Sequence, residues 1–196
     1  MGIMKNVLII DTSIGATLVA LVSAAGVDVS ERKPAAGTNT SQNIIPHIDA
    51  VLSARGLTVA DVPYVAVAVG PGSFTGLRIG VSVANAMMTA GKALLPVNLL
   101  DMLAYGEEEG TLVALPSRVG FCYTNQGEKS VTEVADAKSV GTEGTGARKV
   151  VDRTAYGQRL VRYVLEHLGD AEVQPAVPVY LKKSQAERLR EGDNRD

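Results

Sequence analysis

Short apolar runs alternate with Gly-, Ser- and Thr-rich turns along the first half of the chain, and the spacing within each run predicts its secondary structure. Apolar residues recur at helical spacing over residues 42–55 and 75–90, and each pattern stops at a glycine, Gly56 or Gly91. Strands are predicted over residues 6–11, 17–22, 27–33, 65–69 and 94–97. The predicted order is therefore three strands, a helix, a strand, a helix and a strand.

This order of elements predicts the fold class. Three meandering strands extended by a right-handed strand-helix-strand crossover give a mixed five-stranded sheet with helices packed on it. Such an α/β lobe is typical of the ribonuclease H-like, actin-like (ASKHA) fold. A further helix over residues 98–108 is expected to lead into a Glu-rich boundary before the second half of the chain.

The pattern of apolar runs in the second half of the chain predicts a degenerate copy of the elements of the first half. Three strands are predicted over residues 111–115, 120–125 and 130–135, then a Gly/Thr/Ser-rich loop over 136–147, a strand over 148–152 and a helix stopped by Gly169. Because this half is too short for a full crossover set, we expect a shortened second lobe. The predicted division is a first lobe over residues 1–105, a reduced second lobe over 106–181 and a charged, flexible tail over 182–196.

Composition narrows the class of protein. With 46% hydrophobic residues in 196, the chain can bury a sizeable core. Its apolar runs are far shorter than the roughly 20 residues that a membrane span needs, and no signal-peptide layout begins the chain, so we expect a cytoplasmic protein without a membrane partner. A net charge of −2 gives no broad cationic surface for holding nucleic acid unaided. Cys122 is the single cysteine, which excludes an internal disulfide and favours a buried thiol.

The junction between the fourth strand and the second helix contains Gly70, Gly72 and Gly76. Its Gly-x-Gly-x-x-x-Gly spacing differs by one residue from the dinucleotide-binding pattern, and it lacks the Gly-Lys-Ser/Thr ending of a P-loop. Ser73 can cap the helix, whose N-terminal N–H groups attract anions. Two interpretations follow: a structural turn with a cap, or a phosphate or partner contact made by Gly70, Gly72 and Ser73.

The first strand ends in Asp11-Thr12-Ser13, where actin-type phosphotransferases keep an Asp and a small turn for metal and phosphate. Here Ile14 precedes Gly15 in that turn. A plain turn in which Asp11 and Ser13 bond to the backbone is one interpretation, and a vestigial phosphate loop is the other.

No catalytic or metal-binding constellation is predicted. His47 and His167 lie on different predicted helices without a repeated ligand spacing, and His47 is expected to be a surface or hydrogen-bonded histidine. Nucleophilic catalysis at Ser13 or Ser73 would need a nearby base that the sequence does not supply. We therefore expect neither catalytic residues nor a bound metal.

Small residues recur every four positions along the second helix, at Gly76, Gly80 and Ala84. Such a stripe lets another helix approach closely, and methionines adapt to a partner surface. Packing on the chain's own sheet and packing in an intermolecular helical bundle both remain open. The candidate partner interface comprises Ile48, Leu52, Gly76, Gly80, Val83, Ala84, Met87 and Met88.

Asp11-Thr12-Ser13, the predicted helix from residue 42 and, above all, the run Gly70-Pro71-Gly72-Ser73-Phe74-Thr75-Gly76-Leu77-Arg78-Ile79-Gly80 closely resemble the TsaB/YeaZ family. The resemblance covers nearly all of residues 6–105 and resumes at residues 178–181. Two positions depart from the family pattern: Thr40 stands where His is frequent, and Pro116-Ser117-Arg118 replaces Asp-Ala-Arg.

The resemblance implies a noncatalytic, actin-like subunit that scaffolds TsaD, with the ATPase TsaE joining the complex. TsaD is the subunit that transfers threonylcarbamoyl to adenosine 37 of tRNA. The helices over residues 42–55 and 75–90 would form the bundle used for TsaD or, alternatively, for a homodimer. No cofactor of its own is expected beyond a nucleotide at the subunit boundary, and tRNA is reached only through the complex. The rival hypotheses are a stand-alone glycoprotease-type metallopeptidase and an actin-like small-molecule kinase.

Overall fold

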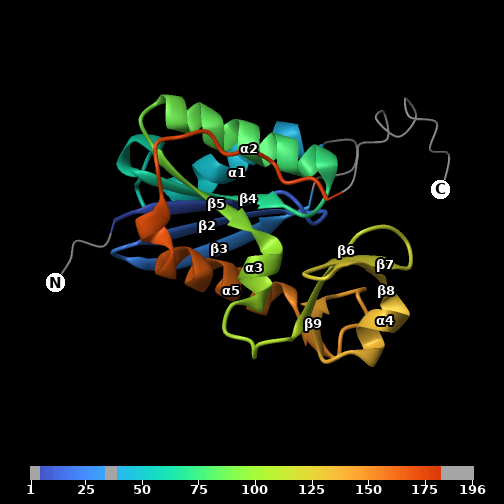
Figure 1. Cartoon of the computed structure of the whole chain (residues 1–196). Coiled ribbons are helices and arrows are strands. Elements are labelled where there is room, and N and C mark those ends of the chain that lie inside the picture. Colours follow the sequence, from blue (N-terminus) through green and yellow to red (C-terminus); the bar gives the residue numbers. More distant parts are fainter. Residues whose placement is uncertain (1–4, 34–38, 182–196) are drawn as a thin grey trace.

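The structure, a computed structural model, describes residues 5–33 and 39–181 and contains two mixed five-stranded sheets (Figure 1). The first sheet has the order β3-β2-β1-β4-β5, with β1 antiparallel to β2 and parallel to β4. Its strands are β1 (Val7–Asp11), β2 (Thr17–Ser23), β3 (Gly26–Arg32), β4 (Tyr64–Gly70) and β5 (Ala93–Asn98). The predicted order of elements and the actin-like fold class are confirmed for this lobe.

Helices cover both faces of the first sheet, and its central strands are therefore buried on both sides (Figure 1). Leu8 and Ile10 of β1 pack in a core with α1 (Thr40–Ser53) and α2 (Phe74–Thr89). Val7 and Ile9 face the opposite way, into a core with α3 (Leu99–Ala104) and α5 (Arg153–Glu166). Two short 3-10 helices follow α1 and α5 in the chain, η1 (Val59–Asp61) and η2 (Leu168–Asp170).

The second sheet repeats the topology of the first, strand for strand. Its order is β10-β9-β6-β7-β8, with a three-stranded antiparallel meander followed by two parallel strands. The strands are β6 (Leu112–Pro116), β7 (Phe121–Thr124), β8 (Gly127–Ser130), β9 (Ser139–Thr142) and β10 (Lys149–Val151). The copy is therefore complete in its five strands, and the prediction of a loop over residues 136–147 missed one of them. The lobe is shortened because a loop, rather than a second crossover helix, joins β9 to β10.

Two predicted elements of this lobe are corrected. Residues 130–135 were expected in a strand but contribute to α4 (Val131–Asp136), whose start is fixed by a capping box between Ser130 and Glu133. That Ser-x-x-Glu spacing is a helix-start signal. Residues 136–147, expected as a loop, contain β9, whose apolar content is limited to Val140.

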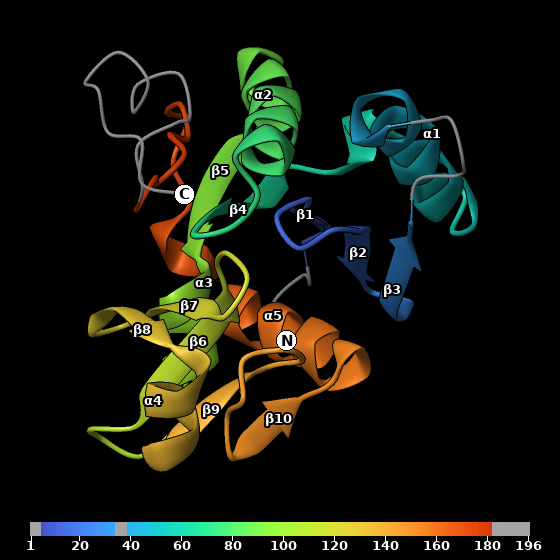
Figure 2. The ribbon, with the colours of Figure 1, turned by 90° about the vertical axis from the view of Figure 1, so that its right-hand side faces the viewer.

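The end of the described chain returns to the first lobe. Residues 171–181, here called the C-terminal strap, run alongside β5 and α2 although the sequence predicts them as part of the second lobe (Figures 1 and 2). Glu172 pairs with Leu94 of β5, and Ala176 is buried in the core beneath α2. The predicted tail over residues 182–196 lies outside the described residues.

Two further expectations can be compared with the described part of the chain. Cys122 is a buried free thiol, as predicted, and burial raises its pKa. None of the helices within residues 5–33 and 39–181 is long and apolar enough to cross a membrane.

Candidate functional site

The Asp11 carboxylate lies at the carboxyl end of β1 and is fully buried. Its Oδ1 accepts hydrogen bonds from the Ser13 N–H at 2.8 Å and the Ser13 hydroxyl at 2.6 Å. Its Oδ2 accepts one from the Tyr156 hydroxyl of α5 at 2.7 Å. Both oxygens are thus bonded within the chain, as a structural turn requires.

Tyr156 is buried against this carboxylate with an exposed fraction of 1%. Burial, followed by the negative charge of Asp11, raises the pKa of Tyr156 well above its ordinary value. The phenol therefore stays protonated and acts as a donor. Beside it, Arg153 bonds both to Glu31 of β3 and to the Ile14 carbonyl oxygen, so α5 is tied to the turn and to the edge of the first sheet.

The glycine-rich junction packs directly on the Asp11 turn. The Ser73 N–H donates to the Ser13 carbonyl oxygen at 2.8 Å, and the Thr12 hydroxyl donates to the Gly76 carbonyl oxygen at 2.6 Å. A Cβ atom at Gly72 would lie 2.7 Å from the Ser13 Cβ, and one at Gly76 would lie 2.0 Å from the Thr12 carbonyl oxygen. The glycines therefore let the start of α2 rest on the backbone of the first turn.

The C-terminal strap covers the other side of the junction. The Val179 N–H donates to the Val69 carbonyl oxygen at 2.7 Å, and a Cβ at Gly70 would lie 2.5 Å from the Val179 carbonyl oxygen. The Tyr180 ring packs on Phe74 with centroids 4.5 Å apart. Gly70 has φ +126, a conformation that side chains disfavour, so this position requires glycine for both reasons.

This arrangement favours the structural interpretation of the junction over a phosphate contact. The Ser73 N–H is bonded to Ser13, both Asp11 oxygens are bonded to hydroxyl and amide donors, and the strap lies against Gly70. The structure does bring the predicted residues together: Asp11, Thr12, Ser13, Gly70, Gly72 and Ser73 form one cluster, with Ser73 at its exposed edge. Its chemistry is that of a structural joint between β1, α2, α5 and the strap.

Most of the predicted interface residues serve the chain's own core. Gly80 faces Thr12, because a Cβ there would lie 2.5 Å from the Thr12 hydroxyl oxygen. Val83 and Met88 are partly exposed. The other six are buried within the chain: Ile48, Leu52, Gly76, Gly80, Ala84 and Met87. The small-residue stripe thus faces the first sheet and turn, the intrachain alternative that the sequence left open.

His47 is buried and hydrogen-bonded, which is the second of the two expected alternatives rather than the surface position. Its Nε2 lies 2.8 Å from the Ser30 hydroxyl oxygen of β3, while Nδ1 has no partner within residues 5–33 and 39–181. Burial and the charge of Arg32 lower the pKa of His47 to about 4.

Within residues 5–33 and 39–181, no group of three or more His, Cys, Asp or Glu side chains is placed to hold a metal ion.

Sequence reasoning missed two contributors to this cluster. Tyr156 lies in the helix predicted before Gly169, where nothing local indicates a contact with Asp11, and the strap is indicated only by the resemblance at residues 178–181. A local signal for the strap is the pair Phe74 and Arg78, an aromatic residue and a cation one turn apart on α2. The Phe74 ring packs on the Tyr180 ring, and the Arg78 Nε donates to the Tyr180 hydroxyl at 3.2 Å.

Comparison with known proteins bears on the family. A family model described as TsaD, tRNA N6-adenosine threonylcarbamoyltransferase, matches residues 34–156. Two curated proteins named tRNA threonylcarbamoyladenosine biosynthesis protein TsaB are similar. The one from Haemophilus influenzae is 32% identical over 127 residues, or 62% of this chain and 53% of that protein. The one from Escherichia coli is 33% identical over 125 residues, or 60% and 53%. The chain spans about half the length of these relatives.

Solved structures share the fold. YeaZ from Pseudomonas aeruginosa superposes with a TM-score of 0.65 at 23% identity, covering 90% of this chain and all of that one. A crystal structure described as an uncharacterized protein with similarity to peptidase YeaZ, from the same organism, gives 0.66 at 22%, covering 91% and 100%. The two mixed five-stranded sheets, together with the matching family model, define an actin-like protein of the TsaD type. Within that class, the chain belongs to the TsaB/YeaZ family.

Proposed function

We propose that this chain is a noncatalytic subunit of the machinery that forms N6-threonylcarbamoyladenosine at position 37 of tRNA. The observation that carries the proposal is its 32% identity over 127 residues to a protein named for threonylcarbamoyladenosine biosynthesis. TsaD is the proposed catalytic partner and TsaE the proposed third component. Contact with tRNA would come only through the complex.

The closed joint supports a noncatalytic role. The Asp11 carboxylate, which an actin-like phosphotransferase would use, is bonded to Ser13 and Tyr156 instead. No cofactor of its own is proposed for the chain. A nucleotide at the boundary with TsaD would need contacts beyond the Ser73 amide, which is bonded to Ser13.

The proposed docking surface is the outer face of α1 and α2. Arg78, Ser82 and Ala86 of α2 are exposed at four-residue intervals, and Val83 lies beside them, partly exposed. The buried members of the predicted interface would hold these helices in position rather than meet a partner. A homodimer through the same face is the alternative assembly, and it would compete with TsaD.

Reconstitution tests the proposal. TsaD, TsaE, unmodified tRNA and threonylcarbamoyl adenylate are incubated with and without this chain, and the modified nucleoside is measured by mass spectrometry. We expect product only when the chain is present, and no product from the chain alone. Product formation that does not depend on the chain contradicts the proposed role.

A pair of charge variants tests the docking surface. Ala86→Glu places a charge on the exposed face of α2 and is expected to abolish co-purification with TsaD while leaving the melting temperature unchanged. Glu166→Arg alters an equally exposed position on α5 and is expected to have no effect. Equal binding by both variants would assign the contact to another face.

The rival hypotheses have their own readouts. A metallopeptidase requires bound metal, which elemental analysis of the purified chain measures. A small-molecule kinase requires the chain alone to bind ATP, which calorimetry measures. Metal at one equivalent per chain, or saturable ATP binding, would favour the corresponding rival.

A further inference from the structure

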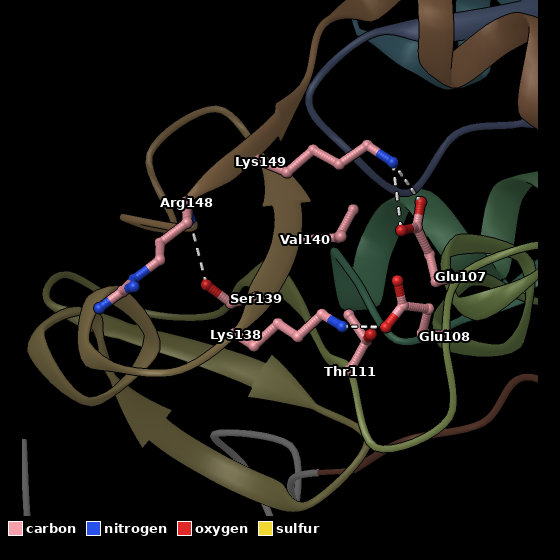
Figure 3. A pocket seen from close by; sticks show the side chains of 8 residues that line it. All are labelled: Glu107, Glu108, Thr111, Lys138, Ser139, Val140, Arg148 and Lys149. Atoms are coloured by element: carbon pink, nitrogen blue, oxygen red, sulfur yellow. Dashed lines mark hydrogen bonds and ion pairs between the residues drawn. The ribbon is translucent and has the colours of Figure 1, made fainter.

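A cavity of about 250 Å³ lies apart from the glycine junction, between the linker that follows α3 and the edge of the second sheet (Figure 3). Pockets for drug-sized ligands typically enclose about 300–1,000 Å³, so this one suits a ligand no larger than a single amino acid. Its lining residues are Glu107, Glu108, Thr111, Lys138, Ser139, Val140, Arg148 and Lys149.

Charges of both signs border this cavity. Lys149 pairs with Glu107 at 2.8 Å, and Lys138 pairs with Glu108. The side chains of Lys138, Glu108 and Lys149 are 66%, 81% and 60% exposed. Ion pairs as exposed as these are weak, so their members can exchange partners at little cost.

Glu107 differs from the other three charged groups. Its side chain is only 12% exposed and also pairs with Arg159 of α5 at 2.5 Å. If Lys149 turns to a new anion, Glu107 keeps a cationic partner. Lys149 and Lys138 lie on either side of Val140 in Figure 3, so both ammonium groups border the same space. Arg148 points away, since its Nε donates to the Ala135 carbonyl oxygen.

Thr111 supplies an independent observation. The residue is 6% exposed, and its Oγ1 is buried without a hydrogen-bond partner anywhere in the described part of the chain. Its main-chain groups are satisfied, because the N–H donates to the Glu108 main-chain carbonyl oxygen and the carbonyl oxygen accepts from the Asn125 side-chain amide. Buried hydroxyl groups almost always have a partner, so this one points to a polar group supplied from outside the chain.

We propose that the cavity binds a small hydroxyl-bearing α-amino acid in its zwitterionic form. The ligand carboxylate is held by the ammonium groups of Lys149 and Lys138, and its ammonium group by the Glu108 carboxylate. The ligand hydroxyl pairs with Thr111 Oγ1, and its aliphatic carbons lie on Val140, which is 3% exposed. Neither an anion nor a cation alone satisfies both sets of charges.

Titration of the full chain with L-threonine, followed by amide chemical shifts in NMR spectra, tests this assignment. We expect saturable shifts at Thr111 and Val140 with a dissociation constant in the millimolar range. L-Valine has nearly the same shape without the hydroxyl and is expected to bind about tenfold more weakly, because it leaves Thr111 unpaired. N-acetyl-L-threonine lacks the ammonium group and is expected not to bind.

Variants separate the roles of the residues. Thr111→Val removes an unpaired hydroxyl, should fold normally, and is expected to abolish the preference for L-threonine over L-valine. Glu108→Gln is expected to abolish binding, whereas Glu166→Gln, a matched exposed glutamate on α5, retains it. Unmoved Thr111 and Val140 resonances in the wild type, or equal binding of L-threonine and L-valine, overturns the proposal. Neither result bears on the reconstitution experiment above, which reads tRNA modification.

Discussion

Replacing Gly76 with alanine is expected to destabilise the protein because the added methyl group has no room. Its Cβ would lie 2.0 Å from the Thr12 carbonyl oxygen and 3.0 Å from the carbonyl carbon. A flexible side chain could move aside, but this neighbour is backbone. The turn is held on α2 by the Thr12 hydroxyl bond to the Gly76 carbonyl oxygen and by the Ser73 N–H bond to Ser13.

The size of the effect follows from three contributions. Overpacking a filled site costs about 1–3 kcal/mol. Loss of the buried Thr12 hydrogen bond adds about 1 kcal/mol, and the better helix propensity of alanine offsets about 1 kcal/mol. We therefore expect Gly76→Ala to lower the free energy of unfolding by about 2 kcal/mol, and the melting temperature by about 4–8 °C.

Urea denaturation and calorimetry of the purified variants measure this change. Gly169→Ala is the matched control, because a Cβ at Gly169 has no neighbour within 4 Å among the described residues. The control should stay within about 0.5 kcal/mol of the wild type. If Gly76→Ala did the same, the turn would not be rigidly seated on α2, and the explanation given for the glycine stripe would fail.

Two further predictions concern buried polar groups. The pKa of His47 is about 4 in the folded state and about 6.5 when unfolded, so its contribution to stability is complete above pH 6.5 and is lost as the pH falls toward 4. Urea titrations at several pH values should show a loss of about 2 kcal/mol, which is less than full linkage gives because Ser30 and the backbone can relax. His47→Gln should flatten this dependence of the free energy of unfolding on pH. Tyr156→Phe leaves Asp11 Oδ2 buried without its donor and should lower the free energy of unfolding by about 1–3 kcal/mol, whereas an unchanged value would mean that water replaces the phenol.

The first sheet was predictable because its central strands β1, β2 and β4 carry apolar runs, as strands covered by helices on both faces do, while the edge strand β3 alternates apolar and polar residues. The second sheet was harder, since β8 is short and polar and β9 has Val140 as its only large apolar residue. The start of α4 was missed although Ser130 and Glu133 have capping-box spacing, because Val131 and Val134 also suit a strand.

The candidate site shows where sequence patterns stop being informative. The residues of the joint were identifiable in the sequence as turn and glycine positions. The sequence did not show which part of the protein the small-residue side of α2 contacts. That orientation depends on Thr12, which is 64 residues from Gly76. Tyr156 is 145 residues from Asp11, and no local spacing connects them. The Thr111 hydroxyl was likewise missed, because an unpaired group is defined by surroundings that the sequence does not list.

The C-terminal strap also has a consequence for biosynthesis of the chain. The first sheet is complete in sequence at Asn98, yet one of its faces is covered by α5 and its core is closed by Ala176. A nascent chain that has emerged only to residue 105 contains α3 but not α5, so the face of the sheet that carries Val7 and Ile9 is only partly covered. The lobe that is translated first can reach its final packing only after α5 and Ala176 have left the ribosome.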